Sequence, residues 1–269
     1  MFDHILNSVQ TLSYSSLLGL AVVVGFAAAN AKSLPLAYTL RLLPSLYQLL
    51  QPRLSSSKKS KSTTSSIPST SHSFSAVRPA LFKHNVMTSR AVAFDLDINV
   101  HKSNSTFFAD ADISRARLLT GLLSQSLAEL GPANFILAGV QCKFQREIRP
   151  YQAYAVSSRI LAWNDKTLYT VTYFLKPGTK LPFKTEVEGG PAALVKDEKL
   201  RKNIFATMVT KYVFKAGRTT VAPEHVFRTA GLIVDTEKGA DAHNDGLLEG
   251  DNVRSAVRIG LEYVTQSMD

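Results

Sequence analysis

The residues best suited to chemistry lie in one short stretch, residues 94–108, which reads FDLDINVHKSNSTFF. If its first part is extended, Asp97, Asn99 and His101 point to one side, because successive strand side chains alternate between faces. A carboxylate, a carboxamide and an imidazole beside a helix N-terminus could bind a carbonyl, activate water and stabilise an oxyanion. The alternative is an Asx-rich turn that only caps the helix, since Asn, Asp and Ser favour such positions.

The same run, Asp-Leu-Asp-x-Asn-x-His-x-x-Asn followed by an aromatic pair, resembles the signature of hotdog-fold acyl thioesterases. It is similar to the 4-hydroxybenzoyl-CoA thioesterase group and to the plant acyl-carrier-protein thioesterases, which carry Asp-x-Asn-x-His-x-Asn-Asn. The likeness is greatest to the fungal and animal branch of membrane-anchored "thioesterase superfamily member 6-like" proteins. It extends through residues 145–151, 159–166 and 211–215, and so covers roughly residues 85 to 232.

This resemblance implies roles for the catalytic candidates. Asp97 matches the general base or nucleophile, Asn99 would hold the attacking water or the thioester carbonyl, and His101 would hydrogen-bond or relay a proton. The plant enzymes place an acid–cysteine pair on the following strand. Glu147 matches the acid, whereas Ile148 takes the cysteine position, which leaves a carboxylate-based mechanism.

The start of the predicted helix would hold the substrate. Backbone N–H groups there would meet the oxyanion, where the helix dipole favours negative charge. The family's tandem asparagines become Ser103-Asn104, so the hydrogen bonding differs at this point. The expected substrate-binding residues are Asn104, Ser105, Phe107 and Phe108, with the phenylalanines as core and pocket wall. The resemblance further implies an acyl-CoA or acyl-carrier-protein substrate and a homodimer with sites near the subunit boundary.

Each catalytic candidate also has a structural interpretation. Asp97 could cap a turn, His101 could be a satisfied surface histidine, and Glu147 could pair with Arg146 or Arg149 across a strand. The competing functional class is a non-catalytic acyl-CoA-binding, lipid-binding or interaction module of the same fold. A thioester dehydratase or isomerase also shares the fold but usually shows a different Asp/His spacing.

Composition and charge exclude several other classes. The net charge is +10, but residues 1–85 carry eight Lys/Arg against the single Asp3, which leaves only +3 for the remainder. The basic excess therefore belongs to the N-terminal part, and we expect no nucleic-acid partner. The single cysteine, Cys142, excludes an intrachain disulfide and a cysteine-based zinc site. The six histidines show no metal-ligand spacing, so we expect neither a metal nor a cofactor.

The composition of the N-terminal residues predicts a membrane anchor over residues 1–33. Residues 5–31 contain no Asp, Glu, Lys, Arg or His, and about 20 helical residues suffice to cross a bilayer. A cleaved signal peptide is the alternative, since Ala27-Ala28-Ala29 resembles a cleavage site, but Asp3 and the basic residues after the run favour an uncleaved anchor. The positive-inside rule then places the following domain in the cytosol. The run and its basic flank therefore predict a single-pass protein, and the resemblance implies that its membrane is the endoplasmic reticulum.

Four further regions follow the anchor. Residues 34–53 contain Arg41, Pro35 and Pro44, which suit an interfacial helix better than a second span. Residues 54–76 are dominated by Ser, Thr and Lys and predict a disordered tether. The hotdog domain occupies 77–232, with an insertion at 177–199 that is either a functional cover or disordered. Residues 233–269 hold an acidic loop and a C-terminal helix that docks on the domain.

Within the domain, hydrophobic periodicity predicts one long helix and an antiparallel sheet, an α+β class. The helix runs from Phe107 to about residue 127, with Ser103, Asn104 and Ser105 as N-cap candidates. Asp110 and Asp112 would complement the helix dipole, and Asp112 is spaced for an ion pair with Arg115. The predicted strands are 86–97, 136–148, 153–162, 168–176 and 204–215, and helices are predicted at 223–229 and 251–268.

Overall fold

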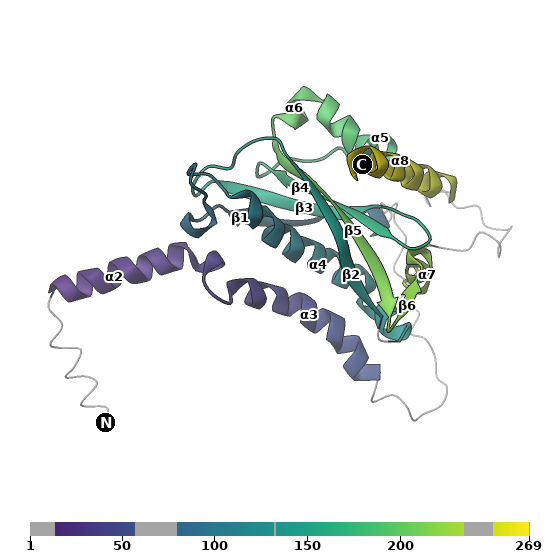
Figure 1. Ribbon diagram of the computed structural model, residues 1–269, viewed down its shortest axis with the longest axis horizontal. Coiled ribbons are helices and arrows are strands. Elements are labelled where there is room, and N and C mark those ends of the chain that lie inside the picture. The colour runs from purple at the N-terminus through teal and green to yellow at the C-terminus, as the bar shows by residue number, and fades with distance from the viewer. Residues whose placement is uncertain (1–13, 57–79, 132, 234–249, 269) are drawn as a thin grey trace, which may run out of the picture.

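The computed structural model describes residues 14–56, 80–131, 133–233 and 250–268. Within these residues, a six-stranded antiparallel sheet curls around the long helix α4 (Asn104–Glu129) (Figure 1). The strands are β1 (Asn85–Arg90), β2 (Ala133–Phe144), β3 (Ala153–Trp163), β4 (Leu168–Leu175), β5 (Ile204–Ala216) and β6 (Thr219–Val221). Their order is β1-β3-β4-β5-β2, and β6 pairs with β5. The predicted hotdog-type α+β class is confirmed.

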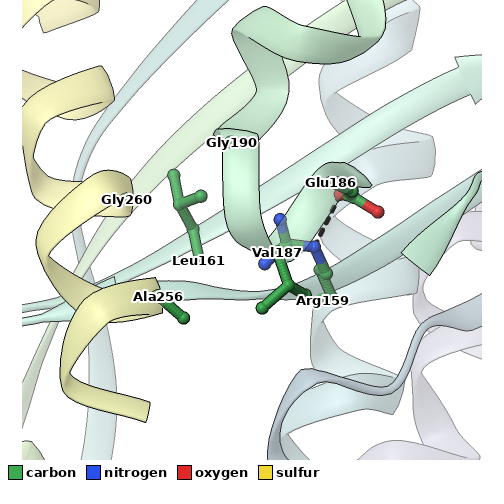
Figure 2. Close-up of a pocket in the computed structure, with 7 residues that line it drawn as sticks. All are labelled: Arg159, Leu161, Glu186, Val187, Gly190, Ala256 and Gly260. Carbon is green, nitrogen blue, oxygen red and sulfur yellow. Dashed lines mark hydrogen bonds and ion pairs between the residues drawn. The ribbon is translucent and has the colours of Figure 1, made fainter. Parts of the chain in front are cut away.

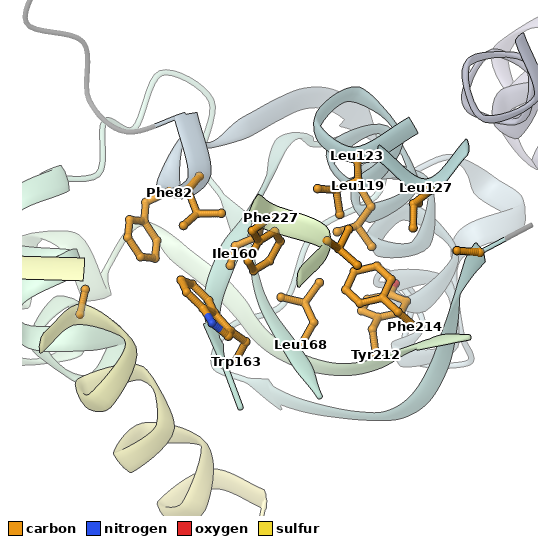
Figure 3. Packing of buried hydrophobic residues seen from close by; sticks show 14 of the residues in the cluster. Phe82, Leu119, Leu123, Leu127, Ile160, Trp163, Leu168, Tyr212, Phe214 and Phe227 are labelled. Carbon is orange, nitrogen blue, oxygen red and sulfur yellow. The ribbon is translucent and has the colours of Figure 1, made fainter. Parts of the chain in front are cut away.

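An apolar stripe on the second half of helix α4 packs the helix against the sheet. Leu119, Leu123 and Leu127 recur every four residues, so they lie one above another on the face toward the sheet. All three are fully buried, in a cluster that includes Tyr212 and Phe214 of β5 (Figure 3). Burial of each leucine side chain stabilises the fold by about 2 kcal/mol. Truncating one of them to alanine would cost about 2–5 kcal/mol.

The central strands are covered on both faces. All residues of β4 are buried, because α4 lies on one side and helices α5 (Phe183–Lys196) and α8 (Gly250–Met268) lie on the other (Figure 1). The insertion expected at 177–199 is thus helical where it packs on the sheet, and α5 is followed by the short helix α6 (Glu198–Arg201). Gly260 lets α8 approach β3, since a Cβ there would lie 2.7 Å from the Leu161 carbonyl oxygen.

The N-terminal segment folds back onto the domain. It consists of α2 (Tyr14–Ala29), the 3-10 turn η1 (Ala31–Ser33) and α3 (Ala37–Ser56). Helix α3 packs against α4, whereas α2 projects away from the sheet (Figure 1). Among the described residues, none of the helices combines the length and the apolar character needed to cross a bilayer. Part of the predicted anchor (1–13), most of the predicted tether (57–76) and much of the acidic loop (234–249) lie outside the described residues.

Several predicted boundaries need correction. The strand predicted at 86–97 ends at Arg90 and is followed by the 3-10 turn η3 (Ala93–Asp95), in which the Asp95 N–H donates 2.9 Å to the Val92 carbonyl. The strand predicted at 136–148 ends at Phe144, and β6 was not predicted. Helices α7 (Pro223–Thr229) and α8 confirm the predictions for the C-terminal part, and α8 docks on the domain as expected.

Candidate active site

A tight turn carries Asp97 and His101, so the extended geometry expected from the alternation is wrong. Leu96 and Lys102 pair at the base of the turn as an isolated antiparallel bridge. The Asp97 N–H donates 3.0 Å to the His101 carbonyl, and the Val100 N–H donates 3.0 Å to the Asp97 carbonyl. Val100 adopts φ +60°, a left-handed conformation that no strand residue has. The three polar candidates therefore share a turn and not a strand face.

The turn nevertheless brings two of these side chains into contact. Asp97 Oδ1 lies 3.4 Å from His101 Nδ1 and accepts a 2.9 Å hydrogen bond from the Asn99 N–H. The second contact is an Asx turn, the local geometry that Asp favours. The Asp97 and His101 side chains are 29% and 31% exposed, so water can reach the pair. Asn99 is exposed and supports Asp97 through its backbone.

The N-terminus of α4 follows directly after the turn. Ser103 is the N-cap residue, but its side chain makes no capping hydrogen bond, and its Oγ lies 3.0 Å from Ser105 Oγ. The Ser103 N–H donates 2.7 Å to the Asp95 carbonyl, which joins the helix start to the base of the turn. Asn104 and Ser105 are exposed in the first helical turn. N–H groups of a first turn lack intrahelical acceptors and form the positive end of the helix dipole.

Glu147 lies in the loop after β2 and not on a strand. The loop runs beside the turn, because the Lys102 N–H donates 2.9 Å to the Ile148 carbonyl. The Glu147 side chain is 56% exposed, and its Oε1 lies 3.8 Å from Nε of Arg149. An exposed ion pair at this distance is too weak to fix the carboxylate. Glu147 can therefore turn toward solvent or toward a ligand.

The two phenylalanines have different environments. Phe107 is fully buried, with ring centroids 4.7 Å from Phe174 and 5.2 Å from Phe144. Phe108 is 37% exposed on the outer side of the first turns of α4. Phe107 is thus part of the core, whereas Phe108 is available as a wall for a ligand.

A buried charge cluster beneath the turn was not predicted. Asp110 accepts hydrogen bonds from Lys102 Nζ (3.0 Å), Lys32 Nζ (3.2 Å), Arg41 Nη2 (2.9 Å) and the Tyr154 hydroxyl. Burial alone would raise the pKa of Asp110, but the charges of Lys102 and Lys32 hold it well below its usual range. Burial also lowers the pKa of Lys102. Asp110 also lies beyond the first turn of α4, where the expected helix-dipole role applies, so its ion pairs and not the dipole account for its charge.

One sequence signal could have revealed this cluster. Asp110 follows Phe107 by three residues and precedes Ser114 by four, so it lies on the buried stripe of α4. A charged residue on such a stripe is almost always paired. The pairing of Asp112 with Arg115, at 3.5 Å, is confirmed.

Residues 92–226 match the family described as the thioesterase-like superfamily. The chain belongs to the thioesterase-like superfamily. The resemblance found in the sequence is thereby confirmed.

Two relatives by sequence carry thioesterase names. A Penicillium oxalicum protein named thioesterase poxG is 37% identical over 184 residues, which are 63% of this chain and 60% of that protein. A Saccharomyces cerevisiae protein, probable thioesterase YBR096W, is 33% identical over 168 residues, 62% of each chain. The match thus spans about three fifths of these relatives. Escherichia coli YbaW, a probable thioesterase of known structure, gives a TM-score of 0.41 at 12% identity over 56% of this chain and 98% of its own.

The thioesterase-like domain has a second polar network between β3 and α5, and Figure 2 shows its Arg159–Glu186 ion pair. Arg159 Nε donates 2.6 Å to Glu186 Oε1, and His84 Nε2 lies 2.7 Å from Glu186 Oε2. Ser157 Oγ lies 2.8 Å from His84 Nδ1. Ser157 is almost fully buried and the adjoining pocket has no space for a water molecule, so this network joins α5 to β3 and offers no accessible nucleophile.

The remaining reactive groups of the thioesterase-like domain support no alternative chemistry. Cys142 lies on β2 as a free thiol, and burial raises its pKa to about 12, which suppresses the thiolate. Within the described ranges, no three His, Cys, Asp or Glu side chains gather in a way that could hold a metal ion. Within the described residues, Asp97 and His101 form a carboxylate–imidazole contact that is about 30% exposed to solvent.

Proposed function

We propose that this chain hydrolyses acyl thioesters, either acyl-CoA or acyl-carrier-protein esters, at a membrane surface. The observation that carries the proposal is the Asp97–His101 contact beside the N-terminus of α4 in a thioesterase-like chain. Relatives that are named thioesterases support the general reaction.

In the proposed mechanism, the Asp97 carboxylate takes a proton from a water molecule whose oxygen attacks the thioester carbonyl. The oxyanion of the tetrahedral intermediate meets backbone N–H groups at the N-terminus of α4, the positive end of the helix dipole. His101, in contact with Asp97, relays the proton to the departing thiolate as the C–S bond breaks. Asn99 would hold the water or the carbonyl, and Glu147 would serve as a second acid at the site.

The proposed substrate contacts are the side chains that are exposed at the start of α4. Asn104 and Ser105 are exposed where the thioester would lie, and Phe108 offers an apolar wall for the acyl chain. Phe107 would act indirectly, since it packs behind that wall in the core. The release of a free thiol and a fatty or aromatic acid is the measurable outcome.

A homodimer is part of the proposal. β2 is last in the strand order, so one of its edges has no strand partner in the described part of the chain. This strand exposes Ile136, Leu137 and Phe144. Long exposed edge strands with apolar side chains are normally paired or covered. Pairing of two β2 edges would cover this surface and bring the end of each β2 close to the neighbouring subunit.

The membrane is the proposed location. The described part of the uncharged run forms α2, which exposes Leu18, Val22 and Val23 by more than half. Helix α3 likewise exposes Leu40 and Tyr47. We propose a single-pass anchor in the endoplasmic reticulum with the domain in the cytosol. Protease added to intact microsomes should digest the domain without detergent, and protection of the domain would contradict the topology.

Substrate profiling tests the proposed reaction. Full-length protein in mild detergent is incubated with acyl-CoA esters of increasing chain length, and thiol release is followed, with Asp97→Ala alongside. Hydrolysis by the wild type and loss in the variant would support the proposal. Tight acyl-CoA binding without turnover of any ester would instead favour a non-catalytic acyl-binding module.

A further inference from the structure

Lys32 reaches from the N-terminal segment into the floor of the candidate site. It lies in η1 between α2 and α3, and its Nζ is 2.5 Å from Asp95 Oδ2 and 3.2 Å from Asp110 Oδ2. The same ammonium donates to the Tyr154 hydroxyl at 2.7 Å and to the Arg90 carbonyl at 3.0 Å. Its side chain is only 17% exposed. An ammonium held by this many acceptors fixes the groups around it.

The neighbours of Lys32 dock at the same place. Ser33 Oγ donates 2.6 Å to the second oxygen of the Asp95 carboxylate. Asn30 is completely buried, and the rings of Phe26 and Phe94 meet edge to face at 5.5 Å. The end of α2 and the whole of η1 therefore sit against the residues that lead into the Asp97 turn.

Asp95 is in turn part of the base of that turn. Its carbonyl accepts the Ser103 N–H at 2.7 Å, and the next residue, Leu96, forms the bridge to Lys102. Lys102 Nζ is held by Asp110 at 3.0 Å and by Thr106 Oγ1 at 2.9 Å. Asp95 and Lys102, at the two ends of the turn, thus both place their side chains in the charge cluster that contains Lys32.

Removal of Lys32 would redistribute these charges. Asp95 Oδ2 now lies 2.5 Å from Lys32 Nζ and 3.6 Å from Lys102 Nζ. Without Lys32, Lys102 becomes the nearest cation to a buried carboxylate, and attraction draws it from Asp110 toward Asp95. Because Lys102 directly follows His101 in the chain, this movement would displace the imidazole and the turn.

We propose that Lys32 is a positioning residue for the reaction: it holds Asp95, and thereby keeps Asp97 and His101 in place at the start of α4. This inference rests on the proposed hydrolysis. The N-terminal segment would then help to position the catalytic residues, in addition to its proposed role in membrane attachment. A fragment that begins after this segment lacks the positioning residue and would show a weakened site.

The test compares three full-length variants in detergent. Lys32→Met removes the ammonium but keeps a long apolar side chain, and Lys32→Arg restores a cation. Arg53→Met is the matched control, because Arg53 also joins the N-terminal segment to the domain, by a 3.2 Å hydrogen bond to Asn134 Oδ1 at the far end of α3. Thiol release from a short soluble acyl-CoA and amide hydrogen exchange of residues 95–106 are measured for each.

For Lys32→Met we expect kcat to fall by about 100-fold, the effect of a displacement of roughly 1 Å in a catalytic group, while KM stays within about twofold. Amides of residues 95–106 should exchange faster, while those of β4 keep their wild-type protection. Lys32→Arg should recover part of the loss, and Arg53→Met should behave as the wild type. Wild-type kcat and exchange in Lys32→Met would overturn the proposal.

Inactive wild-type protein and an unfolded Lys32→Met variant each leave a test of the positioning role. If the wild type hydrolyses no ester, the proposed reaction fails, but faster exchange in residues 95–106 would still support the positioning role and unchanged exchange would refute it. If Lys32→Met does not fold, Ser33→Ala replaces it, since it removes one hydrogen bond to the same carboxylate. About fivefold faster local exchange is then expected, and no change would count against the role.

Discussion

Replacement of Glu186 by glutamine should destabilise the protein strongly, because it breaks a buried ion pair. Glu186 is fully buried, and its carboxylate lies 2.6 Å from Arg159 Nε and 2.7 Å from His84 Nε2. Glu186→Gln keeps the size of the side chain but leaves the buried guanidinium of Arg159 without a counter-charge. Breaking a buried pair in this way costs about 3–5 kcal/mol.

The pKa of Glu186 leads to the same magnitude. Burial alone would raise it, but the charge of Arg159 and the hydrogen bond with His84 outweigh burial and lower the pKa from 4.5 to about 2. At about 1.4 kcal/mol for each pKa unit, this difference corresponds to about 3 kcal/mol. Because the folded-state pKa is depressed, this stabilisation is present above about pH 4.5 and is lost as the pH falls toward about 2.

Urea unfolding at neutral pH, followed by circular dichroism in mild detergent, measures the effect. The matched control is Glu224→Gln, since Glu224 lies at the same 2.6 Å from its partner Arg228 but in an exposed pair. The control should lose no more than about 1 kcal/mol. A loss in Glu186→Gln no larger than in the control, or wild-type stability that is flat from pH 5 to pH 2, would refute the reasoning.

Three further results are expected. Cys142→Ala should retain full activity, because a thiol whose pKa burial raises to about 12 is almost entirely protonated at pH 8; loss of turnover in a thiol-release assay would contradict this. Asp110→Asn should lose about 3–5 kcal/mol in thermal or urea unfolding, since Lys102 remains buried beside a neutral side chain. Sedimentation should show a dimer at micromolar concentration that Ile136→Lys weakens; a wild-type monomer would disprove the β2-edge pairing.

The elements with strong local patterns could be predicted from the sequence. The long helix α4 and the strands β3, β4 and β5 follow hydrophobic periodicity, and their packing agrees with it. The turn at Asp97 could not be predicted in this way. Leu96, Ile98 and Val100 alternate with polar residues as in a strand, but the hydrogen bond from the Asn99 N–H to Asp97 and the positive φ of Val100 close a turn instead.

The partners in the buried charge cluster around Asp110 also could not be predicted from the sequence. Lys32 and Asp110 are 78 residues apart, so no local pattern connects them. Periodicity places Asp110 on the buried face of α4, which calls for a cationic partner, but it does not identify that partner. In the sequence, Lys32 is one of the basic residues that follow the apolar run, and Arg41 belongs to the predicted interfacial helix. Their ion pairs with Asp110 became apparent only once the segment was seen folded against α4.

The rate of thiol release by Asp97→Asn tests the central claim most directly. The amide keeps the size of the carboxylate but cannot take a proton from water, and a positioned general base contributes about 100-fold to 10,000-fold to the rate. We therefore predict that kcat on the best acyl-CoA ester falls by at least about 100-fold, with stability and acyl-CoA binding retained. A variant that hydrolyses the ester at the wild-type rate would contradict the assignment of Asp97 and with it the proposed mechanism.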